Sequence, residues 1–197
     1  MKCLVASRRY NEASELGREW LALSPYDLSA HSAVASASAE TADLGSAARH
    51  LGYVMLLRPQ FEQEHTQLRQ LLLSLAKDTD GSRRLHDIAG DAPDSPRMLD
   101  ELAWLFATYP DSNVRDGAEA VRLAERACKL TDRRVPSLLA TLAAAYAETG
   151  DFSRSVATGE EALSRGRAIG DTDSVKLSEN ILMLLRVDLP YRDNPEQ

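Results

Sequence analysis

Prolines recur along this sequence at a fixed interval of 34 residues, at Pro25, Pro59 and Pro93. Each of them follows a segment that reads as the end of a helix. Proline lacks a backbone N–H and disfavours helical geometry in the residue before it, so it stops a helix at each of these places. A constant interval of this length predicts internal repeats, in which one helical unit recurs and packs on its neighbours.

The same interval predicts where small and large side chains occur. When proline is position 32 of each unit, position 20 is small throughout: Ala13, Ala47, Gly81, Ala120 and Ser155. Position 27 is apolar throughout: Trp20, Val54, Ile88, Ala127 and Ala162. Position 7 is also apolar: Val34, Leu68, Leu102 and Leu142. Position 8 is small with one exception: Ala35, Arg69, Ala103 and Ala143. This agreement in register predicts two packed helices in each unit, with looser packing around Arg69.

Composition disfavours several classes of function. The 197 residues carry 23 Lys and Arg against 30 Asp and Glu, a formal net charge of −7 that repels nucleic acid and anionic membranes. The first residues lack the apolar run of a signal peptide, and no stretch reaches the ~18 apolar residues of a membrane span. We expect a soluble chain with no nucleic-acid partner and no transmembrane segment, in a compartment that the sequence leaves open.

The 34-residue period, its closing proline and the turn before Phe152 resemble those of tetratricopeptide-repeat (TPR) proteins. The resemblance covers nearly the whole chain. It implies an all-α fold, a TPR-type α-solenoid (a right-handed superhelix of antiparallel helix pairs) with a C-terminal capping helix. The implied organisation is a single array: a partial repeat (1–27), a repeat (28–61), a degenerate repeat (62–95), a repeat with a loop insertion at 109–114 (96–135), a repeat (136–169), a capping helix (173–187) and a tail (188–197).

A closer resemblance covers residues 96–193. Segments 102–108, 115–121, 142–152 and 189–193 resemble the C-terminal TPR units of large bacterial TPR-containing proteins. That group includes membrane glycosyltransferases and secretion or assembly factors, so the family alone implies no single role.

The first unit is expected to be incomplete. Met1 falls at about position 8, which removes more than half of the first helix. A repeat cannot bury its apolar face alone, so Leu4, Leu16, Trp20 and Leu23 would be poorly covered. Either the chain is the C-terminal part of a longer protein, or another chain covers this end. A second copy would make a homo-dimer.

The resemblance implies that six positions of each first helix face a concave groove. In the second repeat these positions hold Ser29, Ser32, Ala33, Ser36, Ala39 and Glu40. In the third and fourth repeats we predict a partner-binding set: Gln63, Gln67, Gln70, Arg97, Glu101 and Trp104. Tryptophan and arginine are frequent interface anchors, and glutamine amides can bond a peptide backbone. The alternative is that Trp104 packs against the neighbouring first helix, beside Leu73.

Fragments that suggest an enzyme or a metal site are isolated. Glu62 and His65 have the spacing of two ligands on one helix face, but a second such motif is missing. Cys3 and Cys128 have no metal-ligand spacing, and nothing supports a disulfide between them. No nucleophile has a general base at a recognisable spacing. We expect no enzymatic activity, no cofactor and no metal.

The function that we expect is therefore a non-catalytic protein–protein interaction scaffold, which binds a peptide or a partner protein in its concave groove. Two alternatives stay open. The chain could be the regulatory or substrate-positioning TPR region of a larger enzyme such as a glycosyltransferase, or it could be a module that associates with itself.

Overall fold

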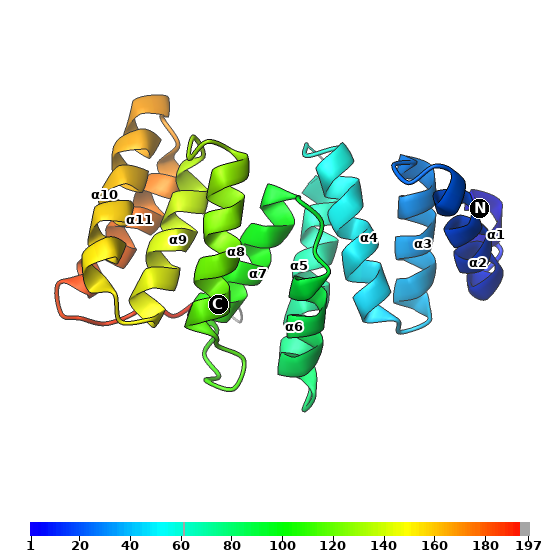
Figure 1. Cartoon of the computed structure of the whole chain (residues 1–197), viewed down its shortest axis with the longest axis horizontal. Coiled ribbons are helices and arrows are strands. Elements are labelled where there is room, and N and C mark those ends of the chain that lie inside the picture. Colours follow the sequence, from blue (N-terminus) through cyan, green and yellow to red (C-terminus); the bar gives the residue numbers. More distant parts are fainter. Residues whose placement is uncertain (61, 194–197) are drawn as a thin grey trace. The chain divides into compact units, whose positions relative to one another are not determined.

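The structure, a computed structural model, describes residues 1–60 and 62–193. Within these ranges the chain forms eleven α-helices and no strand (Figure 1), so the all-α prediction is confirmed. None of these helices is both long and apolar enough to cross a membrane.

The chain divides into two compact units, Met1–Met98 and Leu99–Gln197. Unit 1 contains six helices: α1 (Lys2–Ala6), α2 (Tyr10–Leu23), α3 (Leu28–Glu40), α4 (Leu44–Leu57), α5 (Glu62–Ala76) and α6 (Gly81–Gly90). The boundary falls within α7 (Pro96–Thr108). Unit 2 continues with α8 (Gly117–Leu130), α9 (Pro136–Glu148), α10 (Phe152–Ile169) and α11 (Thr172–Leu185).

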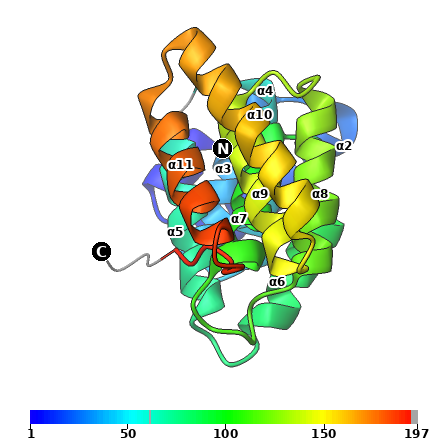
Figure 2. The same ribbon diagram turned by 90° about the vertical axis from the view of Figure 1, so that its left-hand side faces the viewer.

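In both units, consecutive helices pack on one another and are joined by short turns. Helix α3 contacts α2 and α4, and α4 also contacts α5 and α6. In unit 2, α9 contacts α8, α10 and α11 (Figure 2). Every residue of α9 from 138 to 147 is buried, which is expected of a helix that is apolar on all sides.

The positions that recur in the sequence are also the closely packed positions of the structure. The residues at position 20 are all buried: Ala13, Ala47, Gly81, Ala120 and Ser155. The residues at position 7 are fully buried: Val34, Leu68, Leu102 and Leu142. Arg69, the exception at position 8, is exposed, and the following helix α6 has 10 residues where α4 has 14. The buried, closely packed positions of the helices therefore recur at the same repeat positions that the sequence pattern marks.

Aspartate side chains cap the starts of five helices. Each accepts a hydrogen bond from a backbone N–H of the first turn, at 2.7 to 3.2 Å: Asp27, Asp43, Asp116, Asp151 and Asp171. Glycine with positive φ precedes two of them, Gly150 and Gly170, because this left-handed geometry costs glycine little. The caps define where α3, α4, α8, α10 and α11 begin.

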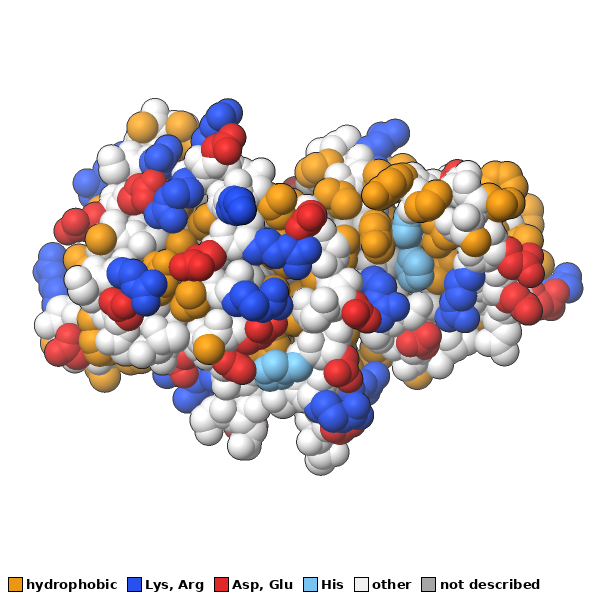
Figure 3. All heavy atoms as spheres, in the orientation of Figure 1, with side chains coloured by type: hydrophobic (Ala, Val, Ile, Leu, Met, Phe, Trp, Pro, Cys, Tyr) orange, Lys and Arg blue, Asp and Glu red, His pale blue; other side chains and the backbone are white. Residues whose placement is uncertain are grey.

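Apolar side chains are exposed on α2 and on the turn that follows it. Leu16, Trp20, Leu23 and Tyr26 are 42%, 48%, 82% and 69% exposed. Figure 3 shows hydrophobic side chains gathered over the part of unit 1 that holds α2, α3 and α4. Trp20 occupies position 27, which is buried in the other units, but α2 packs mainly on α1 and α3 and leaves the indole half exposed.

Candidate functional site

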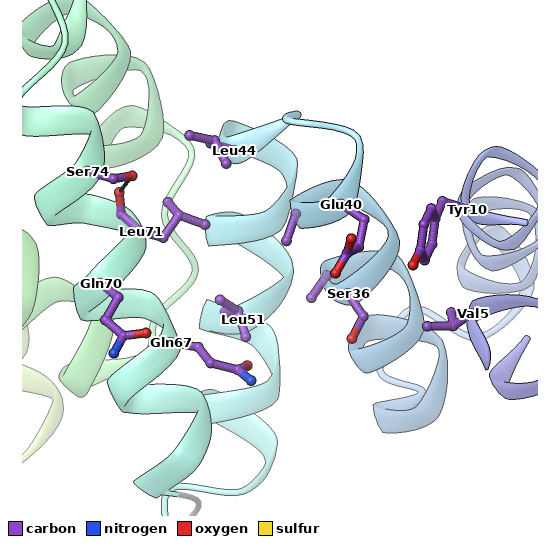
Figure 4. Close-up of a pocket in the computed structure, with 12 residues that line it drawn as sticks. Val5, Tyr10, Ser36, Glu40, Leu44, Leu51, Gln67, Gln70, Leu71 and Ser74 are labelled. Atoms are coloured by element: carbon purple, nitrogen blue, oxygen red, sulfur yellow. Dashed lines mark hydrogen bonds between the residues drawn. The ribbon is translucent and has the colours of Figure 1, made fainter. Parts of the chain in front are cut away.

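A cavity of about 450 Å³ opens on unit 1, between α3 and α5 (Figure 4). Its walls come from five helices, α1 to α5. The lining residues are Val5, Tyr10, Ala35, Ser36, Ala39, Glu40, Leu44, Leu51, Gln67, Gln70, Leu71 and Ser74. This volume lies within the roughly 300–1,000 Å³ of ordinary ligand pockets.

A second cavity, of about 290 Å³, adjoins the first and shares Val5 and Ser36 with it. Its other lining residues are Ala6, Ser29, Ser32 and Ala33. The two cavities therefore follow the face of α3 that carries only serine, alanine and one glutamate. Short side chains along this face keep the space open, since a larger residue at any of these positions would fill it.

The polar groups of the cavity are mostly neutral. Figure 4 shows Gln67 reaching from α5 toward α4 and α3, while Gln70, which also lines the cavity, runs along α5. Both side chains are exposed, and neither amide is hydrogen-bonded within the described part of the chain. Ser36 donates its hydroxyl proton to the carbonyl of Ser32 at 2.9 Å, and Ser74 donates to that of Leu71 at 2.8 Å. These two hydroxyls consequently face a ligand as acceptors, while each amide offers both donors and an acceptor.

Among the described residues that line the cavity, only Glu40 carries a charge. It stands at the last position of α3, is exposed, and has Tyr10 near it in Figure 4. Apolar contact is available from Val5, Leu44 and Leu71. The cavity therefore combines an apolar wall, two amides and one carboxylate. This suits a neutral or basic ligand better than an acidic one.

Of the six predicted binding residues, Gln67 and Gln70 line this cavity. Gln63 is exposed near the start of α5 but is not among the lining residues. Arg97 instead pairs with Glu62 at 2.8 Å and donates to the carbonyl of Pro59 at 3.2 Å. That hydrogen bond, together with the positive charge of Arg97, lowers the pKa of the Glu62 carboxyl.

The other two predicted residues, Glu101 and Trp104, belong to unit 2. Glu101 is 9% exposed, so its carboxylate is largely withdrawn from solvent. Trp104 is half-buried, and its indole Nε1 donates a hydrogen bond of 2.7 Å to Asp193. Its ring also lies 5.5 Å from the ring of Tyr191. A later segment of the same chain thus occupies Trp104 in this structure.

Two lining residues, Val5 and Tyr10, were not anticipated. They come from the partial repeat 1–27, for which only a fragment of the first helix is expected. That fragment is α1, a five-residue helix that still packs on α2 and α3. Val5 is an apolar residue of the partial first helix, and such a residue is expected to face the small side chains of the next repeat. That expectation could have identified Val5 from the sequence.

The described residues contain no group of three or more His, Cys, Asp or Glu that could hold a metal ion. Glu62 and His65, the spacing considered above, are 3.9 Å apart, and the Glu62 carboxylate is also paired with Arg97. Burial raises the pKa of the Cys128 thiol to about 12, which leaves it protonated and unreactive at neutral pH. None of these groups lines the unit 1 cavity.

The comparisons with known proteins add no family: no family model matches the chain, and no curated protein sequence matches it significantly.

Proposed function

We propose that this chain is a TPR-type α-solenoid and that the unit 1 cavity binds an extended peptide segment of a partner protein. The observation that carries the proposal is the elongated space along α3, floored by small side chains and lined by Gln67 and Gln70. An extended peptide presents backbone N–H and C=O groups in alternation, and a glutamine amide can satisfy one of each.

The chemistry of the cavity also indicates which peptide fits. Glu40 favours a lysine, an arginine or a free amino terminus nearby, because a cationic N–H donor offers its carboxylate both an opposite charge and a charge-assisted hydrogen bond. Val5, Leu44 and Leu71 favour an apolar residue beside that cation. The net charge of −7 opposes a nucleic-acid ligand for the same space.

A matched pair of substitutions tests this function. Peptides selected from a random library on the wild-type protein would be labelled, and their affinities measured by fluorescence anisotropy. Ala39→Arg fills the cavity and is expected to weaken binding at least tenfold. Ala22→Arg places the same side chain on an exposed site of α2, away from both cavities, and should leave affinity unchanged.

Two further results would strengthen or overturn the assignment. Replacing both Gln67 and Gln70 with alanine should weaken binding, and Glu40→Lys should reverse the preference from basic to acidic peptides. The cavity is not the binding site if selected peptides bind Ala39→Arg as tightly as they bind the wild type. A library that yields no ligand also counts against the proposal.

Self-association is a second candidate, favoured by the exposed apolar face of α2. Leu16, Trp20 and Leu23 lie three or four residues apart, so they share one side of the helix. A second copy could bury this surface. Sedimentation velocity over a dilution series should then show a dimer that Trp20→Glu converts to monomer. A wild-type protein that stays monomeric at high concentration contradicts this candidate.

A further inference from the structure

Residues 189–193, which we call the return segment, leave the end of α11 and lie against α7 and α9 of unit 2 (Figure 2). The backbone N–H of Asp193 donates to the carbonyl of Thr108 at 3.0 Å. A guanidinium nitrogen of Arg192 lies 3.4 Å from the carbonyl oxygen of Ala107. The segment is therefore bonded to carbonyl groups at the end of α7, where a helix leaves such groups without partners of its own.

Three consecutive side chains of the return segment make three different contacts. The ring of Tyr191 lies 5.5 Å from that of Trp104, at an angle of 44°. Arg192 reaches Glu148 of α9, with 2.7 Å between Nη2 and Oε2. Asp193 accepts the indole proton of Trp104 at 2.7 Å. An aromatic ring, a cation and an anion each meet a matching group, which makes the contact selective for residue type.

The surface under the return segment is held by contacts that do not involve it. Glu148 is 14% exposed on its side chain, and it also accepts from Nε of Arg115 at 2.9 Å. Arg115 is fixed in turn by donating to the carbonyls of Tyr109 and Pro110. Ala107 and Thr108 are buried within α7. These groups would keep their places if the return segment moved away.

The link between α11 and the return segment exposes apolar side chains, and its contacts are backbone hydrogen bonds from Val187, Asp188 and Leu189 to carbonyls at the end of α11. Val187 and Leu189 are 63% and 54% exposed, and Asp188 between them has a φ of 53°. A turn that buries little apolar surface costs little to open. Apart from the backbone bond of Leu189 to the end of α11, the return segment contacts unit 2 through residues 191–193.

We propose that Trp104, Ala107, Thr108 and Glu148 form a binding site for an extended segment with an aromatic residue, an arginine and an aspartate in succession. The return segment fills this site within the chain, and a partner segment of the same chemistry displaces it. The site belongs wholly to unit 2 and uses none of the residues that line the unit 1 cavity, so it does not depend on the function proposed above.

The test uses the full-length chain with the site opened by Tyr191→Ala and Arg192→Ala together. A fluorescent peptide with the sequence of residues 186–193 serves as the probe, and anisotropy measures its affinity. The opened variant should bind the peptide at least tenfold more tightly than the wild type. In the wild type, the tethered segment competes at an effective concentration in the roughly millimolar range.

Three controls separate recognition from non-specific adhesion. A peptide whose arginine is replaced by alanine should bind the opened variant at least fivefold more weakly. Adding Trp104→Phe to that variant removes the indole N–H but keeps a ring, and should also weaken binding. Adding Ala39→Arg, which alters only the unit 1 cavity, should leave binding unchanged.

The proposal is overturned if the peptide binds the wild type and the opened variant equally, or binds neither while circular dichroism shows both to be fully helical. Should the double variant unfold, Arg192→Ala alone gives the same comparison, because it removes the contact to Glu148 and leaves the aromatic pair. Equal binding by that variant and the wild type would likewise refute it.

Discussion

At the scale of single residues, Gly81 shows how closely the small position of a repeat is packed. It is the first residue of α6, and a Cβ atom added there would lie 1.9 Å from the backbone carbonyl oxygen of Leu75. Backbone cannot yield as a flexible side chain can, so Gly81→Ala should lower the free energy of unfolding by about 1–3 kcal/mol. Urea unfolding followed by circular dichroism measures the change.

Gly45 provides the control for that substitution. It lies in the first turn of α4, and an added Cβ would meet no heavy atom within 4 Å. Gly45→Ala should therefore be neutral or stabilise the protein by up to about 1 kcal/mol, because alanine has less freedom to lose on folding. If both variants lose stability equally, steric crowding at Gly81 is not the cause.

The two cysteines differ in environment, which predicts a difference in reactivity. Cys3 is exposed, whereas Cys128 is buried and its Sγ lies 3.5 Å from the carbonyl oxygen of Leu138. Because burial raises the Cys128 pKa to about 12, its thiolate is scarce at pH 8. A thiol reagent such as DTNB should modify one cysteine rapidly and the second only after denaturation. Rapid reaction of both would contradict this burial.

At the scale of helices, a histidine pair joins α3 to α4. His31 Nδ1 and His50 Nδ1 lie 2.8 Å apart, and the other ring nitrogen of His31 is 2.9 Å from the carbonyl oxygen of Pro25. That carbonyl can only accept, so His31 carries its proton on Nε2 and its Nδ1 accepts from His50. The ring of His31 also stacks on Tyr53, with 4.5 Å between centroids. Burial lowers the pKa of both rings, which favours their neutral forms.

This pair predicts that stability falls in mild acid. Burial, followed by the charge that His31 can carry and by the nearby Arg49 and Arg18, lowers the pKa of His50 from 6.5 to about 4. An unfolded chain takes up the proton near pH 6.5 and the folded chain only near pH 4. The neutral His50 therefore makes its full contribution to the free energy of unfolding above pH 6.5. That free energy declines as the pH drops from 6.5 toward 4. After allowance for the partly exposed ring, the loss is about 2 kcal/mol.

Comparison of urea unfolding at pH 7 and pH 4.5 checks the prediction. His50→Gln removes the titrating group, so the variant should lose about 1–2 kcal/mol less than the wild type over this interval. An unchanged dependence on pH in the variant would assign the acid sensitivity to other groups.

The helix boundaries show which structural features can be predicted from a few neighbouring residues. Asp43, Asp151 and Asp171 each stand beside or close to a glycine in a turn-like segment, which by itself predicts a helix start, and α4, α10 and α11 begin directly after them. Capping depends on a side chain and an N–H three residues apart, so it can be inferred without the tertiary structure. The segment 173–187, expected to be a capping helix, contains most of α11, Thr172–Leu185, and its capping role stays a prediction.

At the scale of the whole molecule, the division into two compact units predicts where destabilisation spreads. Phe106 is fully buried in unit 2, and Leu68 is fully buried in unit 1. Truncating either to alanine should cost about 2–5 kcal/mol. Because each unit has its own core, hydrogen exchange should accelerate mainly in the helices of the unit that carries the substitution.

Hydrogen exchange with mass spectrometry resolves the two cases. Phe106→Ala should reduce protection in α8 to α11, and Leu68→Ala should reduce it in α3 to α6. If both variants lower protection evenly along the described helices, the chain unfolds as one cooperative body and the two units have no separate stability.

The six binding residues predicted from the sequence do not lie together in one site: Gln67 and Gln70 line the unit 1 cavity, whereas Trp104 belongs to unit 2. The separation has a physical reason. Register along a helix identifies which side chains share a face, and Gln67 and Gln70 lie exposed on α5, where both line the unit 1 cavity. Register says nothing of what covers a face. The partner of Trp104 is Asp193, 89 residues further along the chain, and no local pattern connects the two.

By itself, the sequence determined that the protein is all-α, where close helix contacts recur and which aspartates begin helices. Each of these follows from interactions within a turn or between adjacent helices. Only the tertiary structure decided that Val5 and Tyr10 join α3 and α5 around one cavity, and that residues 191–193 cover Trp104. Those contacts join segments far apart in the chain, and their positions are set by how the whole of each unit packs.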